Sequence, residues 1–233
     1  MNVLAIDIGG SHVKCLVSSR STPRAFASGP KLTAAAMTRR VLRLTHDWSY
    51  DVVTIGYPGP VLHGAPVREP HNLRKGWVGF DFTGAFARPV RVINDAAMQA
   101  LGSYEGGRML FLGLGTGLGS ALIVDGKLEA LELAHLPYRK GRSFEDYVGA
   151  RGLARLGKKK WRKAVLEVIE ELHAALGSDY VVLGGGNARK MKTLPDYVRR
   201  GNNGKAFLGG FRVWEEQRKR SPDRAVRAVR QIG

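Results

Sequence analysis

The sequence predicts an α/β protein built from two lobes that share a cleft. Two observations carry this prediction: β-rich and helix-periodic segments alternate along the chain, and a strand–glycine turn–strand unit occurs twice, at 3–19 and at 109–124. No low-complexity linker separates the two halves, so the lobes are expected to pack against each other. A chain of 233 residues is long enough to build them.

The first half, residues 1–105, contains the elements of an N-terminal α/β lobe. A turn of Gly9, Gly10 and Ser11 joins two short β-rich runs, as in a tight hairpin. Thr33 is a suitable N-cap for an amphipathic helix that reaches Trp48. The expected strands are 3–8, 13–19, 24–27, 52–56 and 90–94, and the expected helices are 33–48 and 95–101.

The second half, residues 106–204, repeats this plan as a C-terminal α/β lobe. A strand at 109–114 runs into a second glycine-rich turn, and Asp125-Gly126 favours a hairpin after the next strand. The remaining expected elements are an amphipathic helix at 160–176, a strand at 180–183, a turn of three glycines and a helix from about Asn187. A C-terminal helix from about 205–233 is expected to complete the N-terminal lobe.

Composition restricts the class of protein further. The net charge is +17, and residues 151–233 alone contribute +12, with 20 basic and 8 acidic side chains. Such a field attracts polyanions. No run reaches the roughly 18 apolar residues of a membrane helix, and the first ten residues do not form a secretory leader. A single cysteine, Cys15, excludes an internal disulfide, so a cytoplasmic protein that does not act at a membrane is expected.

The two glycine turns suit the binding of an anion. A turn with little side-chain bulk lets backbone N–H groups converge on a phosphate, and hydroxyl groups such as those of Thr116 and Ser120 can add donors. Asp7 lies just before the first turn, where its carboxylate could hold Mg²⁺ or the waters of that ion. An ordinary hairpin is the alternative for either turn alone. Two turns in matched contexts, with a third glycine triplet after a strand, favour a phosphate site.

Neither turn is one of the common nucleotide-binding loops. The pattern GxxxxGK[ST] is absent, and the glycines at 113–117 lead into a strand, ALIV, rather than into the helix of a dinucleotide-binding motif. The expected phosphate site is therefore of another kind.

Four segments together resemble a known family. IDIGGSHVK (6–14), INDAAMQALG (93–102), LGLGTGLGSALI (112–123) and VVLGGGN (181–187) are similar, in this order, to the phosphate-1, catalytic, phosphate-2 and adenosine elements of the actin-like sugar kinases. Within these, the sequence resembles the ROK family and more closely its polyphosphate glucokinase branch, over about residues 3–210. The resemblance implies a two-lobed actin-like, ribonuclease-H-like fold with the active site in the cleft between the lobes.

The resemblance also implies roles for individual residues. Asp95 matches the catalytic base that takes the proton of the sugar hydroxyl, for which helix capping is the alternative role. The residues matching sugar ligands are Asn72, Asn94, Asp95, Glu132, His135 and Glu145. The residues matching the donor site are Asp7, Gly9, Gly10, Ser11, Lys14, Gly115, Thr116, Gly117, Gly184, Gly185 and Gly186, with Asp7 as the Mg²⁺ ligand.

The expected reaction is transfer of a phosphoryl group to the 6-hydroxyl of glucose or a related hexose. The basic residues of 151–233 favour inorganic polyphosphate as the donor, with ATP as a second donor, because a polyphosphate chain offers charge and no base to recognise. The alternatives are a strictly ATP-dependent ROK hexokinase and a non-catalytic, basic polyanion-binding or nucleic-acid-binding protein on the same fold. Family habit implies a homodimer, and a lone cysteine leaves no cysteine cluster for the zinc that many ROK members bind. No specific nucleic-acid partner is expected.

Overall fold

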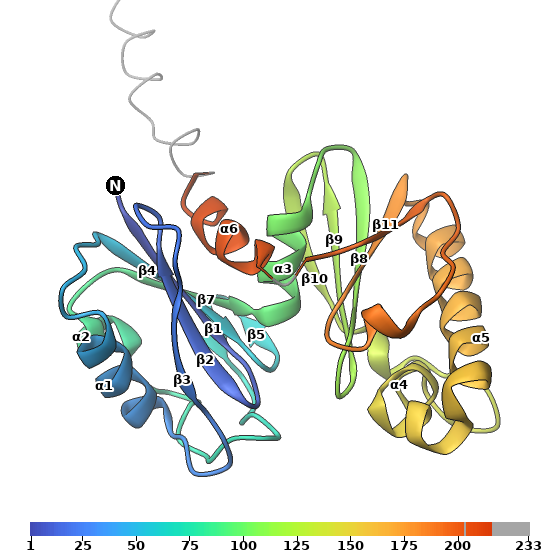
Figure 1. The fold of residues 1–233 in the computed structure, drawn as a ribbon, viewed down its shortest axis with the longest axis horizontal. Coiled ribbons are helices and arrows are strands. Elements are labelled where there is room, and N and C mark those ends of the chain that lie inside the picture. Colours follow the sequence, from blue (N-terminus) through green and yellow to red (C-terminus); the bar gives the residue numbers. More distant parts are fainter. Residues whose placement is uncertain (203, 216–233) are drawn as a thin grey trace, which may run out of the picture.

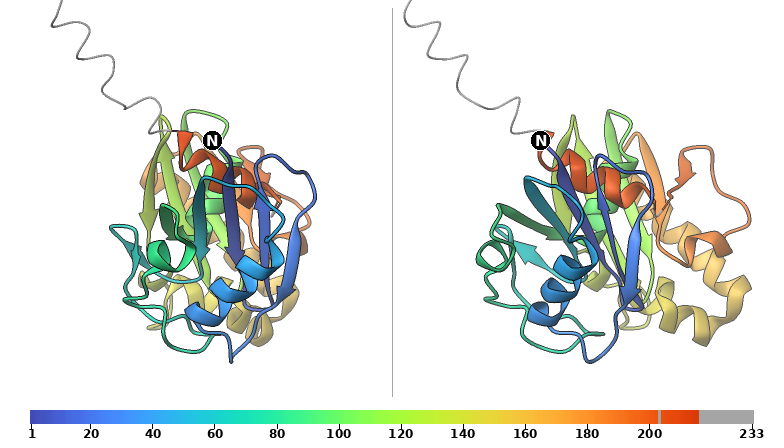
Figure 2. Two further views of the ribbon diagram at one scale, coloured as in Figure 1. Left: turned by 90° about the vertical axis from the view of Figure 1, so that its left-hand side faces the viewer. Right: turned by 60° about the vertical axis from the view of Figure 1, so that its left-hand side comes forward.

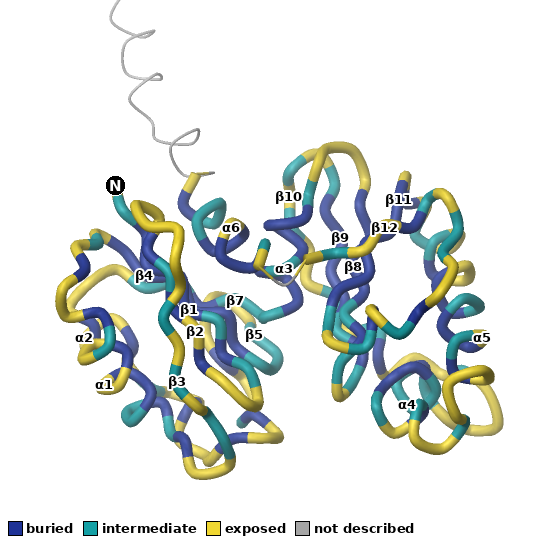
Figure 3. Tube along the Cα trace, in the orientation of Figure 1, coloured by how far each residue is buried: buried dark blue, intermediate teal, exposed yellow. Residues whose placement is uncertain are grey.

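Two five-stranded β-sheets form the body of the molecule and lie side by side along its longest axis (Figure 1). The structure is a computed structural model that describes residues 1–202 and 204–215. Among these residues, no helix is long and apolar enough to cross a membrane. The central strands of both sheets are buried and the turns at their ends are exposed (Figure 3).

The first sheet has the strand order β3-β2-β1-β4-β7. β1 pairs antiparallel with β2 and parallel with β4, because β1 and β2 form a hairpin and β4 returns through helix α1. Apolar side chains of α1 pack on one face of this sheet, and the short helix α2 lies beside α1. The elements are β1 (Val3–Ile8), β2 (His12–Val17), β3 (Arg24–Ala27), α1 (Ala34–Leu44), β4 (Val52–Tyr57), α2 (Phe82–Phe86) and β7 (Val90–Asn94), with a small hairpin of β5 (Val61–Leu62) and β6 (Ala65–Pro66).

The second sheet has the strand order β10-β9-β8-β11-β12. Its first three strands are antiparallel, and β8 then pairs parallel with β11 and β11 with β12. Helix α5 packs on one face through a core that includes Trp161, Val165 and Ile169. The elements are β8 (Arg108–Leu114), β9 (Leu118–Val124), β10 (Lys127–Leu131), the 3₁₀ turn η1 (Leu133–His135), α4 (Phe144–Val148), α5 (Ala150–Leu176), β11 (Tyr180–Gly184), the 3₁₀ turn η2 (Ala188–Lys190) and β12 (Val198–Arg200).

The two sheets follow one plan. In each, two successive antiparallel pairings lie on one side of a central strand and two successive parallel pairings on the other, with β8 in the place of β1 and β11 in the place of β4. The duplication that the repeated strand–glycine turn–strand unit predicts is therefore present. Its consequence is that both glycine turns occur at equivalent ends of their sheets (Figure 1).

Helices α3 (Asp95–Ser103) and α6 (Lys205–Arg212) lie between the sheets and contact each other closely (Figures 1 and 2). Glycines permit this approach: a Cβ atom on Gly102 would lie 1.7 Å from the carbonyl oxygen of Lys205. One on Gly209 would lie 1.8 Å from the carbonyl oxygen of Met98. The two helices therefore meet backbone to backbone.

The end of the described chain returns to the first sheet. Thr54 Oγ1 in β4 donates a hydrogen bond to the carbonyl oxygen of Gly210 at 2.7 Å and accepts one from Trp214 Nε1 at 2.8 Å. Trp214 also packs with Val3 and Val52, so α6 ends beside the N-terminal strand (Figure 2). Of the C-terminal helix expected at 205–233, residues 205–212 are helical, and residues 216–233 lie outside the described part.

Three helix boundaries differ from the sequence-based expectation. Helix α1 ends at Leu44, and the following Trp48 is buried in the core from a turn. Helix α5 begins ten residues earlier than expected, at Ala150, and is broken at Gly157 (φ 71°), a conformation that glycine adopts without strain. The helix expected from Asn187 is only the turn η2, which ends where the chain becomes extended at Met191 (φ −69°, ψ 133°).

Candidate functional site

The second glycine turn is held in place by the third. Asn187 donates from its backbone N to the carbonyl oxygen of Leu114 at 2.9 Å and from Nδ2 to that of Gly115 at 3.0 Å. Gly185 lies against the same strand end, with φ at +80°, and a Cβ there would be 2.4 Å from the Leu114 oxygen. The turns at 115–117 and 184–187 therefore form one backbone-lined surface, which suits phosphate oxygens.

The first glycine turn joins β1 to β2 at the corresponding end of the first sheet (Figure 1). Gly9 donates to the carbonyl oxygen of His12 at 2.9 Å, which closes the hairpin, and Gly10 and Ser11 are exposed at its tip. Asp7 is cross-strand partner to Lys14. Burial raises the pKa of Asp7, and the positive charge of Lys14 partly opposes this increase.

Asp95 is the first residue of α3, and the residue before it caps the helix. The Oδ1 atom of Asn94 accepts hydrogen bonds from the backbone N–H groups of Ala96 and Ala97 at 2.9 and 3.2 Å, and its Nδ2 donates to the carbonyl oxygen of Gly59 at 3.0 Å. Helix capping, the alternative role for Asp95, thus falls to Asn94. The carboxylate of Asp95 accepts a hydrogen bond from the backbone N–H of Ala96, through Oδ1 at 2.8 Å.

The electrostatic surroundings of Asp95 bring together carboxylates from distant parts of the sequence. Burial, together with the negative charges of Asp7 and Glu132, raises the pKa of Asp95 to about 7, against the lowering effect of hydrogen bonds from the backbone of Ala96 and of Asp95 itself. Asp7 belongs to the first sheet, while Glu132 follows the edge strand β10 of the second. Both sheets therefore contribute acidic groups to the environment of Asp95, and a carboxyl group with a pKa near 7 is suited to proton transfer at neutral pH.

Glu145 lies directly against the second glycine turn. Its Oε2 atom accepts a hydrogen bond from the backbone N–H of Leu118 at 3.3 Å, and a Cβ on Gly117 would lie 2.0 Å from this oxygen. Helix α4 holds Glu145 there through a capping box between Ser143 and Asp146. The carboxylate thus joins α4 to the expected phosphate surface.

The other residues expected to bind the sugar are Asn72, Glu132 and His135. Asn72 lies by the first glycine turn, since a Cβ on Gly10 would be 3.8 Å from its Cβ and Nδ2 atoms. Glu132 precedes η1 and His135 ends it, both exposed, and of these two only Glu132 affects the pKa of Asp95. The structure therefore links Asp7, Asp95 and Glu132 electrostatically, Asn72 to the first turn, and Glu145 to the second.

The structure shows two features of this region that the sequence analysis did not predict. Asn187, the tie between the second and third turns, follows directly on the glycine triplet, which is the only signal for it in the sequence. The other is the approach of α5 to η2, where Arg162 Nε donates to the carbonyl oxygen of Lys190 at 2.6 Å. No sequence pattern indicates this contact, because 28 residues separate its partners.

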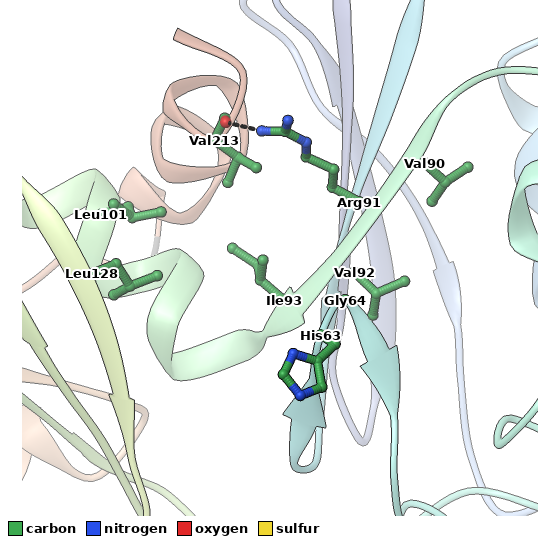
Figure 4. A pocket seen from close by; sticks show the side chains of 9 residues that line it. All are labelled: His63, Gly64, Val90, Arg91, Val92, Ile93, Leu101, Leu128 and Val213. Carbon is green, nitrogen blue, oxygen red and sulfur yellow. Dashed lines mark hydrogen bonds between the residues drawn. The ribbon is translucent and has the colours of Figure 1, made fainter. Parts of the chain in front are cut away.

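A pocket of about 470 Å³ lies apart from these residues (Figure 4). Apolar side chains from β7, α3 and β10 line it, with His63, Arg91 and Val213 at its margin. It contains none of the expected site residues. Arg91 donates to the carbonyl oxygen of Val213 at 2.6 Å and lies over the Trp214 ring, so its guanidinium stabilises the end of the described chain.

Comparison with solved structures identifies the fold. The structure superposes on an inorganic polyphosphate/ATP-glucomannokinase from an Arthrobacter species with a TM-score of 0.74 and 23% identity, covering 90% of this chain and 98% of that one. A ROK-family glucokinase from Streptomyces griseus, in complex with glucose and AMPPNP, matches with a TM-score of 0.68 and 19% identity, covering 90% and 97%. The protein thus has the two-lobed, actin-like fold of the ROK-family sugar kinases, as predicted from its motifs.

Comparison with curated sequences shows similarity to one group of sugar kinases, the polyphosphate glucokinases. The polyphosphate glucokinase of Mycobacterium tuberculosis is 29% identical over 211 residues, covering 79% of this chain and 77% of that protein. The enzyme of the same name from Mycobacterium leprae is 27% identical over 207 residues, with 79% and 63% covered. No family model matches the sequence. The resemblance to the polyphosphate glucokinases that the motifs predict is confirmed.

Proposed function

We propose that this protein is a sugar kinase that transfers a phosphoryl group from inorganic polyphosphate to the 6-hydroxyl of glucose or a related hexose. The observation that carries the proposal is Asp95, a carboxyl group with a pKa of about 7 that shares its surroundings with Asp7 and Glu132. Support comes from the polyphosphate glucokinases similar in sequence and from the sugar kinases similar in fold.

Phosphoryl transfer needs positioning and charge neutralisation more than covalent chemistry from the protein. In the proposed reaction Asp95 takes the proton of the sugar hydroxyl as that oxygen attacks the terminal phosphorus, and the bond to the remaining phosphate chain breaks. In the proposal, the backbone N–H groups of Gly10, Ser11, Thr116 and Gly117 bind the phosphate oxygens, because those of Gly9 and Gly115 close the turns themselves. Lys14 is nearby on β2. Asn72, Asn94, Glu132, His135 and Glu145 would bind the sugar, because amides and carboxylates can each hold two adjacent hydroxyls.

Mg²⁺ would neutralise the phosphates of the donor. A magnesium ion in such sites is usually held by one or two carboxylates, water and substrate phosphates. Asp7 fits this requirement, because it lies two residues before the first glycine turn and is a half-buried carboxylate with Lys14 as its cross-strand partner. In the described part of the chain no three His, Cys, Asp or Glu side chains form a metal site on their own, which suits an ion that is bound together with the donor.

The charge distribution supports polyphosphate as the donor. Residues 151–233 have a net charge of +12, and this part of the chain contains α5 and η2, which lie beside the expected phosphate surface. A strictly ATP-dependent hexokinase would depend on an adenine pocket near 184–187 rather than on basic side chains.

The homodimer implied by family habit is part of the proposal, and size-exclusion chromatography with light scattering tests it.

A matrix of donors and sugars tests the proposed function. Purified protein is assayed with polyphosphate or ATP against glucose, mannose and glucosamine, and an electrophoretic mobility assay with RNA and DNA is run on the same preparation. Hexose 6-phosphate formed from polyphosphate supports the proposal. Turnover with ATP but not with polyphosphate refutes polyphosphate as the donor. Binding of nucleic acid without turnover of any sugar refutes the assignment as a kinase.

A further inference from the structure

Basic residues of α5 lie next to basic residues of η2 and of the segment that follows it in the second lobe. We define the α5–η2 basic face as Lys158, Lys159, Arg162, Lys190 and Lys192. All but Arg162 and Lys190 are exposed, and those two are half-buried. This face lies outside the residues assigned above to the sugar and to the reacting phosphate.

One hydrogen bond joins the two segments of the face. Arg162 Nε donates to the carbonyl oxygen of Lys190 at 2.6 Å, which fixes η2 against the helix. Lys158 and Lys159 precede Arg162 by four and three residues in the helical stretch after Gly157, and residues at this spacing share one side of a helix. The lysines of α5 are therefore on the side of the helix that approaches η2.

The face is continuous with the glycine turns. Lys190 Nζ donates to Oδ1 of Asn187, and the Nδ2 atom of that asparagine donates to the carbonyl oxygen of Gly115 at 3.0 Å. Each step from the second glycine turn to α5 is thus a hydrogen bond: Gly115 to Asn187, Asn187 to Lys190, and Lys190 to Arg162. An anion bound at the turn could extend directly onto the basic face.

The charges of the face have no acidic partners within the described part of the chain. Elsewhere in the molecule, basic residues form ion pairs, such as Arg139 with Glu167 at 3.1 Å and Arg199 with Glu105 at 2.6 Å. In residues 1–202 and 204–215, no ion pair involves a member of the α5–η2 basic face. Neighbouring like charges repel one another, so an anionic ligand would relieve an unfavourable field.

We propose that the α5–η2 basic face is a subsite for the distal phosphates of a polyphosphate chain whose terminal phosphate is at the glycine turns. This inference rests on the proposed function and deepens it. A linear polyphosphate has a charge on every phosphate and can neutralise several lysines at once. A long chain can contact more of these lysines than a short donor, so loss of the face should weaken the binding of long chains most.

Nucleic acid is the competing polyanion, and the aromatic residues of this region argue against it. Binding of single-stranded nucleic acid combines a positive groove with exposed aromatic rings on which bases stack. Trp161 lies next to the lysines in sequence, but it is fully buried and its Nε1 donates to the carbonyl oxygen of Val148 at 2.8 Å. Among the aromatic residues of α6 and the residues directly after it, Phe207 and Trp214 are buried and Phe211 is half-buried. The face offers charge without a stacking platform.

The test compares two variants that each lose three positive charges, one at the face and one elsewhere on the surface. The variant K158Q/K159Q/K192Q is compared with the control R39Q/R43Q/K127Q, which loses the same charge from exposed positions on α1 and β10. We expect the face variant to raise the KM for long-chain polyphosphate at least tenfold. The KM for tripolyphosphate, ATP and glucose should stay within twofold in both variants. Equal changes in the face variant and the control would refute the subsite.

Direct binding separates this inference from the proposed function. Binding of long-chain polyphosphate is measured by titration calorimetry over a series of salt concentrations, without sugar, so that no turnover is needed. The face variant should bind more weakly and with a shallower dependence of log K on log salt, by about 2 for three lost charges. If the face variant binds polyphosphate as the wild type does while the wild type is active, the subsite is refuted and the proposed function stands. If the wild type does not turn over polyphosphate, polyphosphate as the donor is refuted as well. Tighter binding of a single-stranded oligonucleotide, lost in the same variant, would assign the face to nucleic acid.

Discussion

Replacing Asp95 with asparagine separates its chemical role from its structural one. The Asp95→Asn side chain keeps the shape and the Oδ1 acceptor that Asp95 offers to the N–H of Ala96 at 2.8 Å. It loses the ability to take a proton. Because Asn94 caps the helix, the start of α3 should be unaffected. Turnover should slow by about two to four powers of ten, the usual contribution of a general base, with little change in the KM for sugar.

The same variant should be more stable than the wild type at alkaline pH. The pKa of Asp95 is raised to about 7 from 3.8, mainly by burial, so the folded protein retains a proton that the unfolded chain loses. The free energy of unfolding of the wild type should therefore decrease as pH rises from about 4 to about 7 and stay constant above. A difference of about three pKa units corresponds to at most about 4 kcal/mol, and asparagine removes this cost.

Two measurements check this prediction. Urea unfolding of both proteins at pH 5 and pH 8 should show a larger gain for the variant at pH 8. The pH profile of kcat/KM for the wild type should rise below an apparent pKa of about 7 and then level off, because Asp95 must be deprotonated to act as a base. A variant that keeps more than a third of the wild-type turnover rate, or a wild-type rate independent of pH between 5 and 8, would refute the role of Asp95 as the base.

The other predictions concern the close helix contact and the second glycine turn. Gly102→Ala should lower the free energy of unfolding by about 1–3 kcal/mol, as overpacking does, because the new Cβ would lie 1.7 Å from the carbonyl oxygen of Lys205. Urea unfolding measures the loss, and Leu208→Ala, at an exposed position of α6, should change stability far less; equal losses would contradict the close contact. Glu145→Ala should raise the KM for sugar about 10- to 100-fold, the value of one or two hydrogen bonds to a charged group, in steady-state assays with saturating donor. A rise only in the KM for donor would instead mean that Glu145 acts through its contact with the N–H of Leu118.

The local elements follow from the sequence because their causes are local. Alternating and continuous apolar runs predict β1, β4 and β8, and the cap at Thr33 accepts the N–H of Ala36 at 3.2 Å as its position suggests. The hairpin at Asp125-Gly126 forms with both residues at positive φ. Boundaries are predicted less accurately where the determinant is distant, as at the start of α5, where Gly149 and Ala150 pack against the glycine turn at Thr116.

The candidate site was only partly predictable. Motif order indicates which residues belong to it, but spacing along the chain does not show that Asn94 rather than Asp95 caps the helix. Nor does it show that Glu145 contacts the turn at Gly117, since the contact depends on how α4 packs. The raised pKa of Asp95 depends on the same kind of information, because burial and two carboxylates from distant segments produce it.

The sequence by itself determined most of the elements and their order, the repeated strand–glycine turn–strand unit, the two glycine turns and the excess of positive charge in the second half. These depend on the size, polarity and backbone preference of neighbouring residues, which can be read along the chain. Only the tertiary structure decided which charged groups share one environment and which basic residues border the phosphate surface. Electrostatic energy depends on distance in space and on burial, and folding brings together groups that are separated by tens of residues in the chain.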